Sequence, residues 1–160
     1  MLRLYKSLVR PHLEFCISAW SPYYNKDKHL LERVQHRFTR MLPGLKQLPY
    51  HARLELLDLW TFEERRNRAD LLEIFRMYRG WSVNSFDSMF TLDTNTRTRG
   101  HSAKIVKSRC HLEVRRHFFS ERVIDRWNSL QQRDIDCATI IAFKKCLNRT
   151  RLASIGFFTD

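Results

Sequence analysis

Acidic side chains, the usual groups of acid–base and metal-ion catalysis, are scattered along this 160-residue chain, most of them beside Arg or Lys. General acid–base chemistry needs a positioned carboxylate or histidine, and two-metal chemistry needs several carboxylates in one place. Glu63-Glu64 is the only adjacent acidic pair in the sequence, and it is typical of a helix N-terminus, where the backbone dipoles favour negative charge. No GxSxG, P-loop or HExxH motif is present. These residues therefore predict no catalytic centre.

Histidine and cysteine give no stronger signal for chemistry. The seven histidines are isolated and surrounded by cations, so we interpret them as surface or packing residues. The four cysteines form no CxxC pair and fit no zinc ribbon, knuckle or finger; they are Cys16, Cys110, Cys137 and Cys146. We interpret them as reduced, mostly buried thiols of an intracellular protein. We expect no metal and no other cofactor.

Positive charge is the strongest feature of the composition. Lys and Arg number 29 against 17 Asp and Glu, which gives a formal net charge of +12. Such a surplus argues against an enzyme for neutral small molecules and favours binding to nucleic acid or to an anionic membrane surface. The sequence has no apolar window of about 18 residues, so we expect no membrane span. Its first residues contain no uninterrupted apolar stretch, so we expect no secretory signal.

The stretch from Asn25 to Leu45 carries the clearest binding signal, because as a helix it would have two different sides. The apolar side would hold Leu31, Val34, Phe38, Met41 and Leu42. The opposite side would hold Lys26, His29, Arg33, His36, Arg37 and Arg40. Asn25 or Asp27 is expected to cap the start of this helix, and Pro43-Gly44 to end it. The apolar side can anchor the helix while the basic side faces a polyanion.

Further cations extend this signal beyond the 25–45 helix. Any one of them fits a solvated helix face, but together they suit phosphate contacts, which are dependent on salt and independent of sequence. The predicted nucleic-acid-binding residues are Lys6, Arg10, Lys26, Arg33, Arg37, Arg40, Arg97, Arg99, Lys104 and Lys107. Four aromatic residues in loop-like stretches either stack on bases or plug the core; they are Tyr23, Tyr24, Tyr50 and Trp81.

The elements that must position these residues are mainly helices, since the chain has only 4 Gly and 4 Pro. Residues 1–20 predict a helix that Pro11 kinks near Arg10, and residues 49–58 predict a short one. Thr61 and Glu64 form a capping-box pattern that begins a long helix ending near Gly80. That helix is predicted to carry a second basic surface, made of Arg65, Arg66, Arg68, Arg76 and Arg79.

The second half of the chain predicts smaller elements. Residues 81–100 are rich in Ser, Thr, Asn and Asp and predict a linker with one short turn around 86–90. Alternating apolar residues over 110–114 predict a strand, with 104–107 as its hairpin partner. Helices are expected over 117–130 and 137–150. The fold class is thus mainly α: a helical bundle over 1–80, a linker over 81–100 and a small α+β subdomain over 101–160.

Several segments in order resemble one family. The run LYKSLVRPHLEFCISAWSPYYNKDKHLLERVQHRFTRMLPGL resembles the segment after the catalytic palm in reverse transcriptases of non-LTR retrotransposons, the Jockey-like and chicken-repeat LINE class above all. The likeness continues through LPYHARLELLDLWTFEERRNRADLLEIFRMYRG, TRTRGHSAKIV and FFSERVIDRWNSL. The sequence departs from that pattern at Trp60, where a Thr is usual, and at Gln131-Gln132, where a Leu-Pro-like pair is common.

The resemblance implies a helical thumb that grips the template–primer duplex, with Lys6, Arg10, Arg33, Arg37 and Arg40 on or near the duplex backbone. The expected partners are RNA and DNA, together with the palm and fingers of the parent polymerase, and no membrane. The Ala-Asp-Asp-type turn of the palm, to which catalytic magnesium would belong, does not occur in these residues. We therefore expect a C-terminal piece of an RNA-directed DNA polymerase that does not polymerise by itself.

Two other functions remain open on this sequence. The apolar helix faces could make the chain a non-catalytic protein-interaction module. The chain could also be a non-functional remnant of a LINE element. The resemblance and the basic charge favour a nuclear location over a cytoplasmic one.

Overall fold

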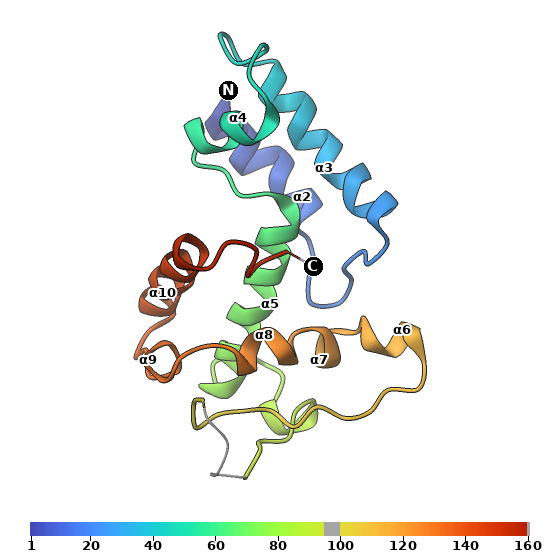
Figure 1. Cartoon of the computed structure of the whole chain (residues 1–160), viewed down its shortest axis with the longest axis vertical. Helices are drawn as coiled ribbons and strands as arrows, with labels where there is room; N and C mark the ends of the chain where they lie inside the picture. Colours follow the sequence, from blue (N-terminus) through green and yellow to red (C-terminus); the bar gives the residue numbers. More distant parts are fainter. Residues whose placement is uncertain (95–99, 160) are drawn as a thin grey trace.

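The computed structural model of the chain describes residues 1–94 and 100–159. It is mainly helical, which confirms the predicted fold class. Figure 1 shows a long helix, α5 (Phe62–Tyr78), running through the middle of the molecule, with one group of helices above it and another beside and below it. The predicted sites Arg97 and Arg99 lie outside the described residues.

The N-terminal region, residues 1–58, forms the upper group. Its elements are α1 (Leu2–Leu4), the π-helical turn η1 (Tyr5–Val9), α2 (Arg10–Leu13), α3 (Asn25–Arg40) and α4 (Tyr50–Leu56). The first helix ends at Leu13, so the prediction of a helix to residue 20 is wrong. Pro11 has no N–H to donate to the preceding turn, and that turn is widened, with the Arg10 N–H bonded to the Tyr5 carbonyl.

The C-terminal region, residues 59–159, contains α5 and the lower group. Its elements are α5 (Phe62–Tyr78), the 3₁₀ turn η2 (Phe86–Ser88), α6 (Glu113–Arg116), α7 (Phe119–Arg122), α8 (Ile124–Asn128), α9 (Gln132–Ile135) and α10 (Ile140–Ala153). The capping box at the start of α5 is confirmed, since the Thr61 side chain accepts from the Glu64 N–H and the Glu64 carboxylate accepts from the Thr61 N–H. Gly80 follows α5 at φ +70°, the left-handed conformation expected of a helix end.

An aromatic core holds the C-terminal region together. Trp127 is fully buried, and its indole N–H donates to the Ala103 carbonyl at 2.7 Å. The rings of Phe75 on α5 and Phe143 on α10 stack at 4.1 Å between centroids. Phe86 and Phe90, which lie in the segment predicted as a linker, are buried in the same core.

The predicted strand over 110–114 is wrong. Glu113–Arg116 is a short helix, and both Leu112 and Val114 are exposed to solvent. Among the described residues, β-type pairing is limited to one isolated antiparallel bridge between Leu92 and Ile105. The alternation of apolar residues did not specify a strand because residues 1–94 and 100–159 contain no neighbouring strand to accept its backbone hydrogen bonds.

Candidate nucleic-acid interface

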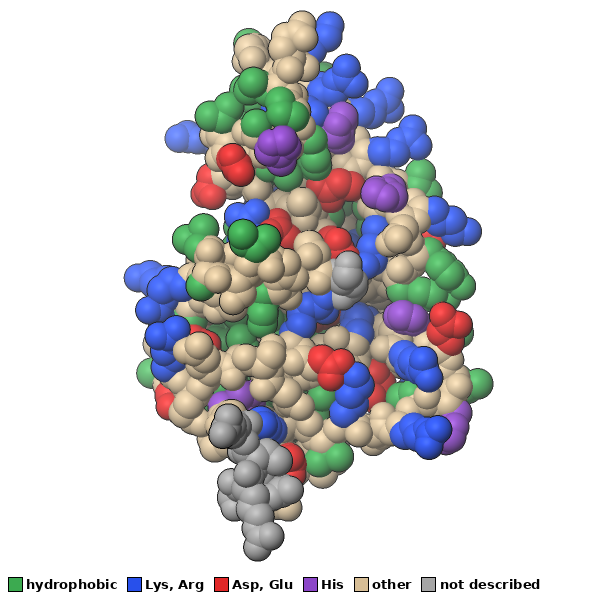
Figure 2. All heavy atoms as spheres, viewed as in Figure 1, with side chains coloured by type: hydrophobic (Ala, Val, Ile, Leu, Met, Phe, Trp, Pro, Cys, Tyr) green, Lys and Arg blue, Asp and Glu red, His purple; other side chains and the backbone are tan. Residues whose placement is uncertain are grey.

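The exposed edge of α3 brings four of the predicted binding residues into one row. Lys26, Arg33, Arg37 and Arg40 are all exposed, and their spacing keeps them on one side of the helix. Figure 2 shows the Lys and Arg side chains that gather along the upper part of the molecule, where α3 lies in Figure 1. Among the ion pairs between described residues, none involves Arg33, Arg37 or Arg40. We call this row the α3 stripe.

A polar network anchors the opposite face of α3, together with the Phe38 ring, which stacks on Tyr5 at 4.1 Å between centroids. Gln35 is fully buried: its carbonyl accepts from the Tyr5 hydroxyl at 3.0 Å, and its amide donates to the Tyr50 hydroxyl at 3.1 Å and to the Trp60 carbonyl at 3.0 Å. The predicted apolar side is therefore partly wrong, because Met41 is 67% exposed. These hydrogen bonds fix the rotation of α3 and so the direction in which the stripe points.

Two titratable groups of α3 belong to this anchoring face. Burial, helped by Arg53 and Arg40, lowers the pKa of His36, so His36 stays neutral at pH 7 and adds no charge to the stripe. Burial raises the pKa of Glu32, whose carboxylate accepts from the Phe62 N–H at 2.8 Å and from the Tyr50 hydroxyl. The hydroxyl bond ties the half-buried Tyr50 into the same polar network.

The other predicted binding residues do not join the α3 stripe. Lys6 is half-buried on η1, and the Arg10 guanidinium on α2 lies 3.9 Å from the Glu14 carboxylate. Lys104 is half-buried in the C-terminal region, where its side chain lies against Gly100. Lys107, in the same region, forms an ion pair with Asp125.

The second basic surface predicted on α5 is wrong. Most of its arginines donate to backbone carbonyls of other segments: Arg66 to Leu13 at 2.7 Å, and Arg79 to Cys137 at 2.8 Å. Arg66 is also buried, with its guanidinium 4.3 Å from the Trp20 ring centroid. Loop and helix-end carbonyls lack partners of their own, so inward-pointing arginines satisfy them.

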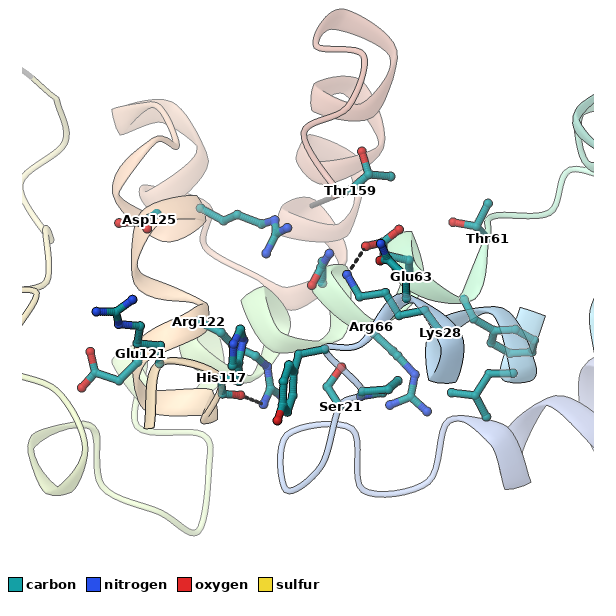
Figure 3. A pocket seen from close by; sticks show the side chains of 18 of the residues that line it. Ser21, Lys28, Thr61, Glu63, Arg66, His117, Glu121, Arg122, Asp125 and Thr159 are labelled. Carbon is teal, nitrogen blue, oxygen red and sulfur yellow. Dashed lines mark hydrogen bonds and ion pairs between the residues drawn. The ribbon is translucent and has the colours of Figure 1, made fainter. Parts of the chain in front are cut away.

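A groove lies next to the stripe, between the N-terminal ends of α3 and α5 and the segment from Lys107 to Arg126. Its cavity volume is about 1040 Å³. Figure 3 shows Lys28 and Glu63 in contact on one side of the cavity, while Glu121 and Asp125 lie across from them. Arg109 and Arg116 are exposed residues of its lining. We call this cavity the 107–126 groove.

Sequence reasoning missed the groove, although a signal was present. The segment from Lys107 to His117 is strongly basic, but its alternating apolar residues favoured a strand. His117 lines the groove and stacks on Tyr23 with 4.1 Å between ring centroids. Tyr23 comes from the loop before α3, and only the fold brings the two rings together.

The cysteines differ from the prediction of mostly buried thiols. Cys146 is buried, Cys16 is exposed, and Cys110 and Cys137 are half-exposed. The sulfur atoms of Cys137 and Cys146 lie 3.3 Å apart. Among the described residues no group of three His, Cys, Asp or Glu side chains is arranged to hold a metal ion. Within residues 1–94 and 100–159, no helix has the length and apolar character needed to span a bilayer.

Comparison with known proteins gives no relative. No family model, curated protein or solved structure matches this chain. The stripe and the groove therefore have to be interpreted from their own geometry.

Proposed function

We propose that the chain is a thumb-like, non-catalytic segment of a non-LTR reverse transcriptase that holds an RNA–DNA template–primer duplex through the α3 stripe. The observation that carries this proposal is the row Lys26, Arg33, Arg37 and Arg40, which is exposed and, in the case of the three arginines, outside the ion pairs of the described residues. At about 1.5 Å per residue the row spans about 21 Å, close to the rise of six base pairs of B-form DNA at about 3.4 Å each. Binding to a chromosomal target would make the working location nuclear.

The exposed side of the first helix supports a larger assembly. Leu4 and Leu8 on this helix are each 61% exposed, and Phe15, just after the helix ends at Leu13, is 70% exposed. Several exposed large apolar residues in one short segment are unusual on a free surface. In the proposed polymerase the palm would cover them. The same observation favours a second candidate function, in which the chain is an interaction module whose apolar face binds another protein.

The salt dependence of duplex binding tests the first proposal. The variant Arg33→Glu/Arg37→Glu should keep its helix, because Glu and Arg have similar helix propensities, and circular dichroism checks this. Log K falls as log salt rises, and each lost phosphate contact makes this negative slope shallower by about 0.9 for B-form DNA. For an RNA–DNA hybrid we expect the magnitude of the slope to decrease by about 2 in this variant.

A matched control carries the same change of charge away from the stripe. Arg133→Glu/Lys145→Glu alters two exposed positions of α9 and α10 and should leave the slope near that of the wild type. If the α3 variant and the control give equal slopes, the α3 stripe is not the duplex-binding surface.

A further inference from the structure

We propose that the 107–126 groove binds a single-stranded nucleic-acid segment that continues from the duplex held on α3. This inference rests on the proposed function and assigns a second part of the ligand to a second site. The stripe and the groove are continuous, because His29 lines the groove and lies one helical turn before Arg33 on the same exposed side of α3. A strand that leaves the stripe at the start of α3 therefore meets the groove.

The charge of the groove suits a phosphate backbone. Its described lining contains seven Lys or Arg side chains and four Asp or Glu side chains. Three of the acids already have partners within the chain: Glu63 pairs with Lys28, Asp125 with Lys107, and Glu32 accepts from the Phe62 N–H. Two further cations of the lining are also engaged, since Arg122 pairs with Asp70 and Arg66 donates to backbone carbonyls. At the rim, Arg109 and Arg116 are exposed, and neither forms an ion pair among the described residues. A phosphate at the rim would meet cations whose charge is not already neutralised.

Aromatic rings beside this rim supply the second requirement of single-strand binding. Tyr23 stacks on His117, and the Tyr24 ring follows at 4.1 Å from the Tyr23 centroid. Tyr24 is 53% exposed, and the Lys26 ammonium at the start of the α3 stripe lies 5.5 Å from the centroid of its ring. Bases stack on such rings with little regard to sequence, for about 1–3 kcal/mol each.

The size of the cavity selects a single strand over a duplex. Its volume of about 1040 Å³ is at the upper end of the range of sites for small molecules, about 300–1,000 Å³. A cavity of this size admits bases and sugars one after another, whereas a full duplex turn has to stay outside on the stripe. The groove is thus assigned to a few unpaired nucleotides of a template or target flank.

Three fluorescent probes separate this inference from the proposed function: a blunt RNA–DNA hybrid, the same hybrid with a short single-stranded flank, and the flank sequence alone. The wild type should bind the flanked hybrid about tenfold more tightly than the blunt one, as one stacked base would give. The variant Arg109→Glu/Arg116→Glu should lose this gain and the binding of the free flank, while its affinity for the blunt hybrid stays within twofold. Arg133→Glu/Lys145→Glu is again the control.

Each outcome bears on one claim. Equal binding of flanked and blunt hybrids by the wild type, or a gain that survives in the groove variant, overturns the groove assignment and leaves the α3 stripe in place. If the stripe fails its own salt test, loss of free-flank binding in the groove variant still supports the groove. Polyglutamate that displaces the free flank as well as an unlabelled single strand does would reassign the groove to an acidic protein segment.

A second measurement does not depend on substitution at the groove. A photoreactive 4-thiouridine in the flank should cross-link to peptides that contain Tyr24 or His117, and the same base within the duplex should not. Cross-links confined to the C-terminal helix α10 would contradict the assignment.

Discussion

The N-terminal and C-terminal regions are both helical but are held together by different forces. The C-terminal region is centred on buried rings such as Trp127, Phe75 and Phe143. The N-terminal region is centred on a polar residue, Gln35, whose hydrogen bonds join three segments, and on the buried Arg53, which donates to the Thr39 hydroxyl and the His36 carbonyl. Apolar packing tolerates small rotations, whereas a hydrogen-bond network holds only in one geometry. The candidate interface lies on the region where orientation is specified most closely.

This contrast also explains why many apolar side chains of the N-terminal region are exposed to solvent. With a polar centre, much of its apolar surface, including Leu4, Leu8 and Met41, remains exposed. Buried apolar area is the main source of folding free energy. We therefore expect the N-terminal region to open at a lower free energy than the C-terminal region.

Removing the largest ring of the C-terminal core should have the largest effect. Trp127→Ala deletes a fully buried side chain and its hydrogen bond to the Ala103 carbonyl, and we expect it to lower the free energy of unfolding by about 3–5 kcal/mol. Urea unfolding followed by circular dichroism measures this loss. Ile141→Ala, at a position of α10 that is 64% exposed, should cost less than about 0.5 kcal/mol. If Trp127→Ala lowers the free energy of unfolding by less than about 1 kcal/mol, buried rings are not what holds the C-terminal region together.

Replacing the polar centre should have a smaller and more local effect. Gln35→Leu leaves the Tyr5 hydroxyl and the Trp60 carbonyl without their partner, which we expect to cost about 1–3 kcal/mol. Hydrogen exchange should become faster in α3 and stay unchanged in α10. The exposed Gln47 provides the control Gln47→Leu. A Gln35→Leu protein as stable as the wild type would show that apolar packing serves the N-terminal region equally well.

The smallest effect concerns a histidine in the aromatic core. Burial lowers the pKa of His101 below its ordinary value of 6.5, and its ring already bonds the Trp127 carbonyl and the Ala103 N–H as a neutral group. The unfolded chain therefore binds this proton more readily, and stability falls as the pH drops below about 6.5. His101→Gln should weaken that fall in urea unfolding measured between pH 8 and pH 5. The exposed His12 provides the control variant His12→Gln. If the curves of stability against pH are parallel for the wild type and His101→Gln, His101 is not the group that causes the fall.

Local signals in the sequence predicted the elements that position the interface. The start of α3 at Asn25, the capping box of Thr61 and Glu64, and the helix end at Gly80 each depend on neighbours within a few residues, and the structure confirms them. The expected side-chain cap from Asn25 or Asp27 is wrong, because no described side chain caps α3, and the helix ends at Arg40, before Pro43-Gly44. The same kind of signal failed over 110–114, since a strand needs a distant partner. It failed again for Arg66, because the carbonyls to which it donates, those of Leu13 and Trp20, lie about 50 residues away along the chain.

By itself the sequence determined that the chain is helical and strongly basic, and that Lys26, Arg33, Arg37 and Arg40 share one side of a helix, because helical periodicity alone puts them there. Only the tertiary structure decided which arginines face solvent and which bind carbonyls. It also decided that Tyr23 meets His117 beside a cationic groove. Such pairings depend on segments far apart in the chain, and no short-range pattern of residue types encodes them.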